Sequence, residues 1–262
     1  MKAWAAATAL AAVIIASAVG LWVTWDSTRT SATDPLVATA PSTTTTTLGD
    51  TADAHTRVTA PAPQCTVGET PVTTDPLDDF GRVVIDTGHS LPAAYTPDDL
   101  VSVARAGFPE DDQVREIVIP DLDAMRKAAA AAGSPFVLVS GYRSYSYQAG
   151  LFSQRVGEVG EAEAGLRTAK PGHSEHQLGT AIDVTDPSLT DLVPAFAATP
   201  AGRWVAAHAW QYGFVVSYPE GAKARTCYEY EPWHLRFVGR FIAGEIHSSG
   251  VTPREWMLSH PR

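Results

Sequence analysis

The chain has 262 residues and a formal net charge of −10 at pH 7. The sequence contains no cluster of basic residues, which argues against a nucleic-acid-binding protein. It also shows no repeat of solenoid period and no glycine-rich phosphate loop, so repeat architectures and P-loop nucleotide binding are excluded as explanations.

The N-terminal segment, residues 1–25, is predicted to meet a membrane. Residues 3–25 carry no charge and have tryptophan near both ends. As a helix this run would be about 35 Å long, enough to cross a bilayer, and tryptophan suits both interfaces. Ala16-Ser17-Ala18 also fits a signal-peptide cleavage site. The length favours a single-pass anchor with its N-terminus inside over a cleaved signal peptide, and both place the remaining chain outside the cytoplasm.

The next segment, residues 26–64, is rich in threonine, serine, proline and alanine, with a hydroxyl run at 42–47. Such a composition has too little apolar surface to offset its ordering entropy, so we expect a disordered stalk. It resembles an O-glycosylated stalk, and a plain unmodified linker is equally compatible with the sequence.

Cys65 and Cys227 are the two cysteines of the chain. An even pair in an exported protein predicts a disulfide. The bridge would join the end of the stalk to the segment just before Glu231. It would close a loop of about 162 residues, for which chain entropy gives on the order of 5 kcal/mol as an upper figure.

Beyond the stalk, residues 65–262 suffice for one well-packed domain, which we expect to be a monomer. Predicted strands and helices segregate rather than alternate, which favours an α+β fold. Residues 157–170 are rich in glycine, glutamate and alanine and predict a mobile loop. The patterns predict helices at 113–132, 146–156, 201–212, 240–247 and 253–258, and strands at 136–140, 181–184, 214–217 and 233–237.

Two short motifs carry the chemistry. The first is SEHQLGTAID at 174–183, in which Gly179 is expected to fold the chain back so that His176 and Asp183 approach each other. The second is EPWH at 231–234, where alternation along the strand places His234 on the same face as Arg236. Two imidazoles and one carboxylate suffice for a catalytic zinc site, which takes three protein ligands and leaves the fourth position to water. Glu231 would remain as a base for that water.

These motifs resemble the SxHxxGxAxD and ExxH signatures of zinc D-alanyl-D-alanine carboxypeptidases of the VanY type, within the LAS group of peptidoglycan peptidases. The resemblance covers about residues 80–258. It implies that His176, Asp183 and His234 bind Zn²⁺ and that the domain is a zinc peptidase with a small antiparallel sheet, flanked by helices, that carries the zinc on one face. It leaves His173, three residues before His176, as a structural or outer-shell residue.

A third segment, SGYRS at 140–144, follows the strand predicted at 136–140 and also resembles the family pattern. The resemblance places Arg143 beside the zinc, where a guanidinium could stabilise an oxyanion or pair with a substrate carboxylate. Gln148 and Ser174 are further candidates for holding the peptide, although polar residues in such positions often cap helices.

The expected function is zinc-dependent trimming of peptidoglycan stem peptides, with the terminal D-alanine as the group removed. An endopeptidase that cuts within the stem or a cross-bridge is the alternative enzyme. A wall-binding module that keeps zinc without catalysis is the alternative of another class, and the presence of Glu231 counts against it.

Overall fold

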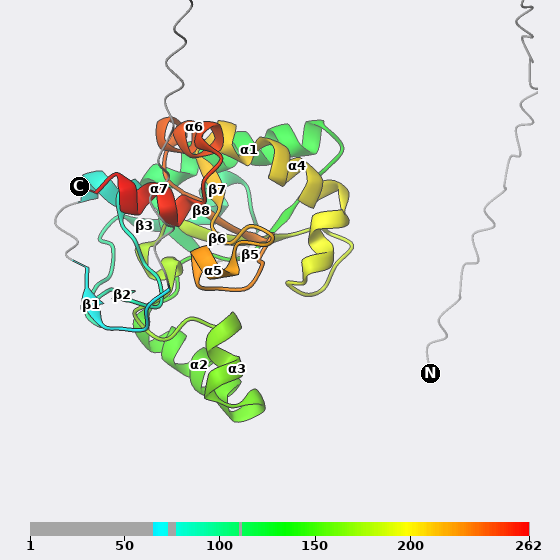
Figure 1. The fold of residues 1–262 in the computed structure, drawn as a ribbon. Coiled ribbons are helices and arrows are strands. Elements are labelled where there is room, and N and C mark those ends of the chain that lie inside the picture. Colours follow the sequence, from blue (N-terminus) through cyan, green and yellow to red (C-terminus); the bar gives the residue numbers. More distant parts are fainter. Residues whose placement is uncertain (1–64, 73–76, 110–111, 262) are drawn as a thin grey trace, which may run out of the picture. The chain divides into compact units, whose positions relative to one another are not determined.

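The structure is a computed structural model that describes residues 65–72, 77–109 and 112–261 (Figure 1). The predicted membrane segment at 1–25 and the predicted stalk at 26–64 lie outside these residues. Among the helices of the described residues, none is both long and apolar enough to cross a membrane.

A four-stranded sheet forms the centre of the domain. Its strand order is β5-β6-β8-β7, and each neighbouring pair is antiparallel. This confirms the small antiparallel sheet expected from the sequence, and each strand end lies within one residue of its predicted position. The strands are β5 (Val137–Ser140), β6 (Ala181–Thr185), β7 (Phe214–Val216) and β8 (His234–Phe237).

The two central strands give the sheet one apolar face and one face that carries ionisable side chains, which we call the chemical face. Ile182 lies opposite Leu235 in the β6–β8 register, and both side chains belong to the main hydrophobic core. The next pair in the register is Asp183 opposite His234. Because successive side chains of a strand point to opposite faces, this pair projects away from the core. The same alternation therefore anchors the strands and presents two ionisable groups.

Three helices lie along the apolar side of the sheet: α1 (Ile119–Ala131), α4 (Pro200–His208) and α6 (Arg240–Ser249) (Figure 1). Leu122 and Met125 of α1 and Val205 of α4 are buried in the main core. Burial of each such side chain is worth about 1.5–3 kcal/mol. A second cluster contains Ile246 of α6 and Trp256 of the helix α7 (Pro253–Ser259).

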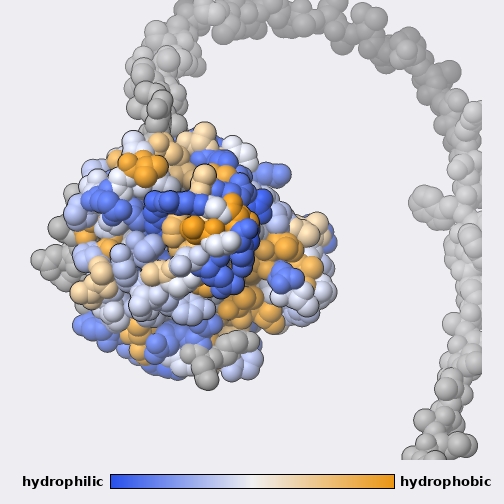
Figure 2. Space-filling model, turned by 90° about the horizontal axis from the view of Figure 1, so that it is seen from below, coloured by the Kyte–Doolittle hydropathy of each residue, from blue (hydrophilic) through white to orange (hydrophobic). Residues whose placement is uncertain are grey.

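The helices α2 (Tyr145–Val159) and α3 (Glu161–Arg167) pack against each other and lie on the other side of the sheet (Figure 1). Seen from that side, hydrophilic residues and smaller apolar patches are interspersed on the surface (Figure 2). The short helix α5 (Lys223–Thr226) and α7 complete the α-helical elements of the described residues.

Short elements connect these parts. The parallel pair is β1 (Thr70–Pro71) with β2 (His89–Ser90), and the antiparallel pair is β3 (Leu100–Ser102) with β4 (Gln113–Arg115). The 3₁₀ helices are η1 (Leu77–Arg82), η2 (Val103–Ala106), η3 (Glu116–Val118), η4 (Glu175–Leu178), η5 (Pro194–Ala198) and η6 (Ala209–Tyr212).

Three sequence-based predictions of local structure differ from the structure. The helix predicted at 113–132 begins only at Ile119, because residues 113–115 pair with β3 and Pro120 starts the first turn of α1. The loop predicted at 157–170 is largely helical. Its glutamates, alanines and leucine are good helix formers. The helical run is interrupted at Gly160, whose φ of 83° separates α2 from α3, and it ends at Arg167. The helix predicted at 201–212 is divided into α4 and η6.

Cys65 and Cys227 form a disulfide with their Cα atoms 5.3 Å apart, as the sequence predicted. Cys227 ends α5 in the left-handed region with a φ of 77°, which is uncommon for a residue other than glycine. The bridge therefore fixes Cys65 to the segment that leads into Glu231.

Reduction of this disulfide is expected to lower the melting temperature. The chain-entropy figure of about 5 kcal/mol corresponds to roughly 10–20 °C for a domain of this size. Thermal unfolding with and without reductant measures the shift, and a Cys65→Ser/Cys227→Ser double variant should not respond to reductant. Alkylation of both thiols in protein never exposed to reductant would contradict the bridge.

Candidate metal centre

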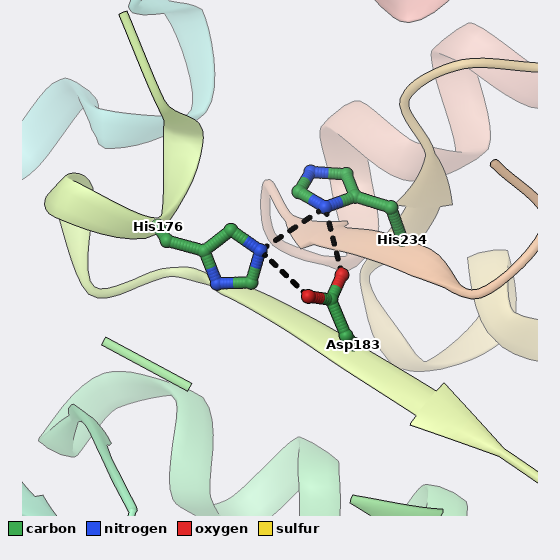
Figure 3. A group of neighbouring side chains, drawn as sticks. All are labelled: His176, Asp183 and His234. Carbon is green, nitrogen blue, oxygen red and sulfur yellow. Dashed lines mark hydrogen bonds and ion pairs between the residues drawn. The ribbon is translucent and has the colours of Figure 1, made fainter. Parts of the chain in front are cut away.

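Three side chains from separate elements meet on the chemical face of the sheet (Figure 3). His176 comes from η4, Asp183 from the middle of β6, and His234 from the start of β8. Gly179 turns the chain between η4 and β6 with a φ of 72°, and a Cβ there would lie 2.9 Å from the Arg115 side chain. The fold-back expected at this glycine is thereby confirmed.

The spacing of the three side chains suits a single small cation. His176 Nε2 lies 3.2 Å from His234 Nδ1 and 3.2 Å from Asp183 Oδ2, and His234 Nδ1 lies 3.0 Å from Asp183 Oδ1. Nitrogen ligands about 2.0–2.1 Å from a tetrahedral zinc ion are separated by about 3.3 Å. The donor set of two imidazoles and one carboxylate therefore fits zinc in both chemistry and distance.

The second nitrogen of each histidine fixes which nitrogen faces the centre. His176 Nδ1 donates to the carbonyl oxygen of Gly141 at 2.6 Å, because a carbonyl can only accept. His234 Nε2 donates to Glu175 Oε2 at 2.9 Å. The two histidines thus present different atoms, Nε2 from His176 and Nδ1 from His234, to the same point.

The electrostatics of the centre favour a bound cation. Burial lowers the pKa of His234, but hydrogen bonds to Asp183 and Glu175 outweigh burial and raise that pKa to about 10. Burial and the nearby Arg143 lower the pKa of His176 to about 4. Burial opposes ionisation of Asp183, yet the two histidines hold its pKa well below the usual value. An ionised carboxylate therefore faces the centre, and a metal ion would displace the proton held on His234.

Glu231 lies beside the centre and is not one of the three converging groups. Its backbone nitrogen donates to the Tyr218 carbonyl at 3.1 Å, and its own carbonyl accepts from the His234 nitrogen at 3.2 Å, so a turn fixes it ahead of β8. Burial raises the pKa of the Glu231 carboxyl to about 7. A carboxylate with that pKa is suited to take up and release a proton near neutrality.

Arg143 approaches the centre from the segment after β5. Its backbone nitrogen donates to the His176 carbonyl at 3.3 Å, and its Nη2 lies 3.9 Å from Asp183 Oδ2. Arg143 Nε is buried and has no hydrogen-bond partner among the described residues. The guanidinium thus lies next to the centre, and its Nε–H group donates to no described residue.

A cavity of about 280 Å³ contains Arg143, Glu231, His176 and His234 in its wall, and a second hollow of about 400 Å³ shares Arg143 and Glu231 with it. Glu231 and Arg143 therefore line both hollows. Two arginines that the sequence had not singled out, Arg155 of α2 and Arg167 of α3, line both hollows.

Gln148 and Ser174 are both buried and both line the first cavity. Gln148 Nε2 donates to the Ala169 carbonyl at 2.7 Å, which ties α2 to the segment after α3, while its Oε1 has no partner within the described part of the chain.

His173 stands apart from the three converging groups and bonds through Nδ1 to the Asp86 carbonyl at 2.7 Å. This position agrees with the structural or outer-shell role expected from the sequence, in which His173 is not one of the three ligands.

The sequence did not predict several residues that support the centre. Tyr218 stacks on His234 with ring centroids 4.9 Å apart, and Tyr228 packs edge-on against Tyr218. Glu175 and Arg236 form a buried ion pair at 2.8 Å behind His234. Of these, only Arg236 left a signal in the sequence, because its spacing of two from His234 placed both on one face.

The protein is of mixed helix and sheet, and three of its buried side chains are placed so that they could hold a metal ion. Residues 111–240 match the family described as VanY, D-alanyl-D-alanine carboxypeptidase. The solved structure of the LdcB LD-carboxypeptidase is 36% identical, with a TM-score of 0.61, and the match covers 66% of this chain and 84% of that one. The chain belongs to the VanY family.

Other relatives agree with this assignment. YodJ of Bacillus subtilis is 39% identical over 178 residues, which are 66% of this chain. The chain spans 65% of the length of YodJ, slightly less than two thirds. A VanY D,D-pentapeptidase variant from a VanB-type resistance cassette, solved in complex with Zn(II), is 26% identical with a TM-score of 0.59, and the match covers 68% of this chain and 99% of that one. VanYB in complex with D-alanine-D-alanine is also 26% identical, with a TM-score of 0.60, and the match covers 70% and 99%.

Proposed function

We propose that this protein is a zinc-dependent carboxypeptidase that removes the terminal D-alanine from peptidoglycan stem peptides. The observation that carries the proposal is the arrangement of His176, Asp183 and His234 around one point, with Glu231 and Arg143 in the wall of the adjoining cavity. The VanY relatives in complex with Zn(II) and with D-Ala-D-Ala support the choice of metal and substrate.

The roles of the residues follow from their positions. A bound zinc ion would supply Lewis acidity, which lowers the pKa of a bound water to about 7 and polarises the scissile carbonyl. Glu231 would accept the proton of the attacking water and deliver it to the leaving amine. Arg143 would hold either the developing oxyanion or a carboxylate of the peptide.

The likeness to LdcB favours a second candidate within the same reaction class, because that relative is named an LD-carboxypeptidase. A D,D-carboxypeptidase releases the last residue of a pentapeptide stem. An L,D-carboxypeptidase releases the D-alanine that follows an L-centre in a tetrapeptide stem. Both reactions liberate one D-alanine, so the length of the substrate distinguishes them.

The test is to incubate the zinc-loaded protein with a pentapeptide stem and, separately, with a tetrapeptide stem, and to weigh the products. Loss of one alanine from the pentapeptide supports the D,D-carboxypeptidase, and loss from the tetrapeptide alone supports the L,D-carboxypeptidase. Two larger fragments would indicate an endopeptidase. Unchanged peptides with zinc bound would indicate a wall-binding module and overturn the proposal.

We also propose that the protein acts outside the cytoplasm as a monomer, with residues 65–262 as its catalytic domain. The Cys65–Cys227 disulfide supports this location, because such bonds persist in oxidising compartments. Residues 1–25 would serve as an anchor or a cleaved signal peptide, and residues 26–64 as a stalk. Cell fractionation combined with N-terminal sequencing of the mature protein distinguishes anchor from signal peptide, and recovery of the full chain in the cytoplasm would contradict both.

Replacing Arg143 with alanine is expected to leave zinc bound, because Arg143 lies outside the three-ligand set. If the guanidinium holds the oxyanion, kcat should fall on the order of 10²-fold with little change in KM. If it binds a substrate carboxylate, KM should rise instead. Steady-state kinetics separate the two, with Arg143→Lys as the control that keeps charge without the planar fork. Parent kinetics in Arg143→Ala would exclude both roles.

A further inference from the structure

Glu175 is a buried carboxylate directly behind the metal centre. It begins η4, one residue before His176, and only 6% of its surface is exposed. Its Oε2 accepts from His234 Nε2 at 2.9 Å and from Ser217 Oγ at 2.6 Å. Its Oε1 accepts from Arg236 Nη1 at 2.8 Å. Each carboxylate oxygen therefore has a specific donor, and one of these donors is Nε2 of His234, the ring nitrogen that points away from the centre.

The partner of this carboxylate is itself fixed by the backbone. Arg236 is fully buried, and its Nη2 donates to the carbonyls of Phe80 at 2.7 Å and Val83 at 2.6 Å. Arg236 follows His234 by two residues in β8, so both side chains reach Glu175 from the same face of the strand. The guanidinium thus holds Glu175, and Glu175 holds the imidazole, in one continuous chain of hydrogen bonds.

We infer that Glu175 is a positioning residue for the metal: it fixes the tautomer and ring orientation of His234 and strengthens the Nδ1 ligand atom, with Arg236 and Ser217 holding the carboxylate in place. A carboxylate behind a metal-bound histidine makes the imidazole a better ligand. The outer nitrogen of His176, Nδ1, donates to the neutral Gly141 carbonyl, whereas that of His234 donates to a carboxylate. The two histidines therefore differ in the charge of their hydrogen-bond acceptors. This inference rests on the proposed zinc site.

If the Glu175–Arg236 ion pair were purely structural, substitution of Glu175 would lower stability without changing zinc affinity. Glu175→Gln keeps the size of the side chain but has one acceptor oxygen and one amide donor. In either amide orientation, the NH₂ group faces donors, either Arg236 or the pair of His234 and Ser217. The loss of such an outer partner typically lowers metal affinity by about 10–100-fold.

The experiment measures zinc affinity by competition with a chelator for the parent protein and Glu175→Gln, together with the melting temperatures of their metal-free forms. Asp86→Asn is the matched control, because Asp86 is also a buried carboxylate bonded to an arginine, Arg254 at 2.6 Å, and contacts none of the three ligands. We expect Glu175→Gln to bind zinc about 10–100-fold more weakly, and Asp86→Asn to lose thermal stability while keeping parent affinity.

The visible spectrum of the cobalt-substituted proteins adds a readout of ligand geometry that a purely structural role would not change. We expect an altered spectrum in Glu175→Gln and the parent spectrum in Asp86→Asn. If Glu175→Gln does not fold, Ser217→Ala removes one hydrogen bond to the same carboxylate oxygen and should weaken zinc several-fold.

Parent-like zinc affinity and cobalt spectrum in the Glu175 variant, or in Ser217→Ala where only that variant folds, would overturn the inference while leaving the zinc site intact. A parent protein that binds no zinc would instead overturn the proposed function, and this inference with it.

Discussion

Replacing Glu231 with glutamine is expected to lower kcat by about 10²–10⁴-fold while zinc stays bound, because general-base catalysis contributes on that scale. Glutamine keeps the size and hydrogen-bonding capacity of the side chain but cannot accept the proton of the attacking water. The structure supports this separation, since Glu231 lines the cavity beside the three converging groups without being one of them.

The measurement pairs steady-state kinetics with elemental analysis of the same Glu231→Gln preparation. Zinc content equal to that of the parent shows that the lost activity reflects the missing base. A variant without zinc would make Glu231 a ligand, and a variant that turns over at the parent rate would make it a bystander.

Replacing any one of His176, Asp183 and His234 with alanine is expected to remove most of the zinc and the activity together. The parent should carry about one zinc per chain, as mononuclear catalytic sites do, and removal of one of three protein ligands leaves two. Each variant also removes one hydrogen-bonding partner from the two groups that remain, because each pair of the three lies 3.0–3.2 Å apart.

His173→Ala is the matched control for the ligand series. His173 is also a buried histidine, three residues before His176, but it bonds to the Asp86 backbone and lies outside the centre. Elemental analysis should find full zinc in this variant. Full zinc in the three ligand variants as well would remove the metal assignment.

The sequence predicted the centre well because its parts are local and periodic. Alternation along β8 places His234 on the same face as Arg236, and in the structure both side chains reach Glu175. Gly179 marks the turn that brings His176 back to the strand. The cysteine pair was predicted from composition and compartment alone.

What the sequence could not predict depends on distant partners. Glu175 is adjacent to a ligand, yet its role follows from His234 and Arg236, about 60 residues away in the chain. Residues 113–115 have a pattern compatible with a helix, and pairing with β3 decides that they form a strand. The break at Gly160 divides two helices where composition alone indicated a loop.

This centre is expected to hold one zinc ion and to use it to release terminal D-alanine. The decisive experiment adds zinc stepwise to metal-free protein and follows D-alanine release from pentapeptide and tetrapeptide stems. We expect the rate on at least one stem to rise in proportion to zinc and to reach a plateau at about one ion per chain. Release at the same rate without zinc, or no release from either stem at full zinc occupancy, would contradict it.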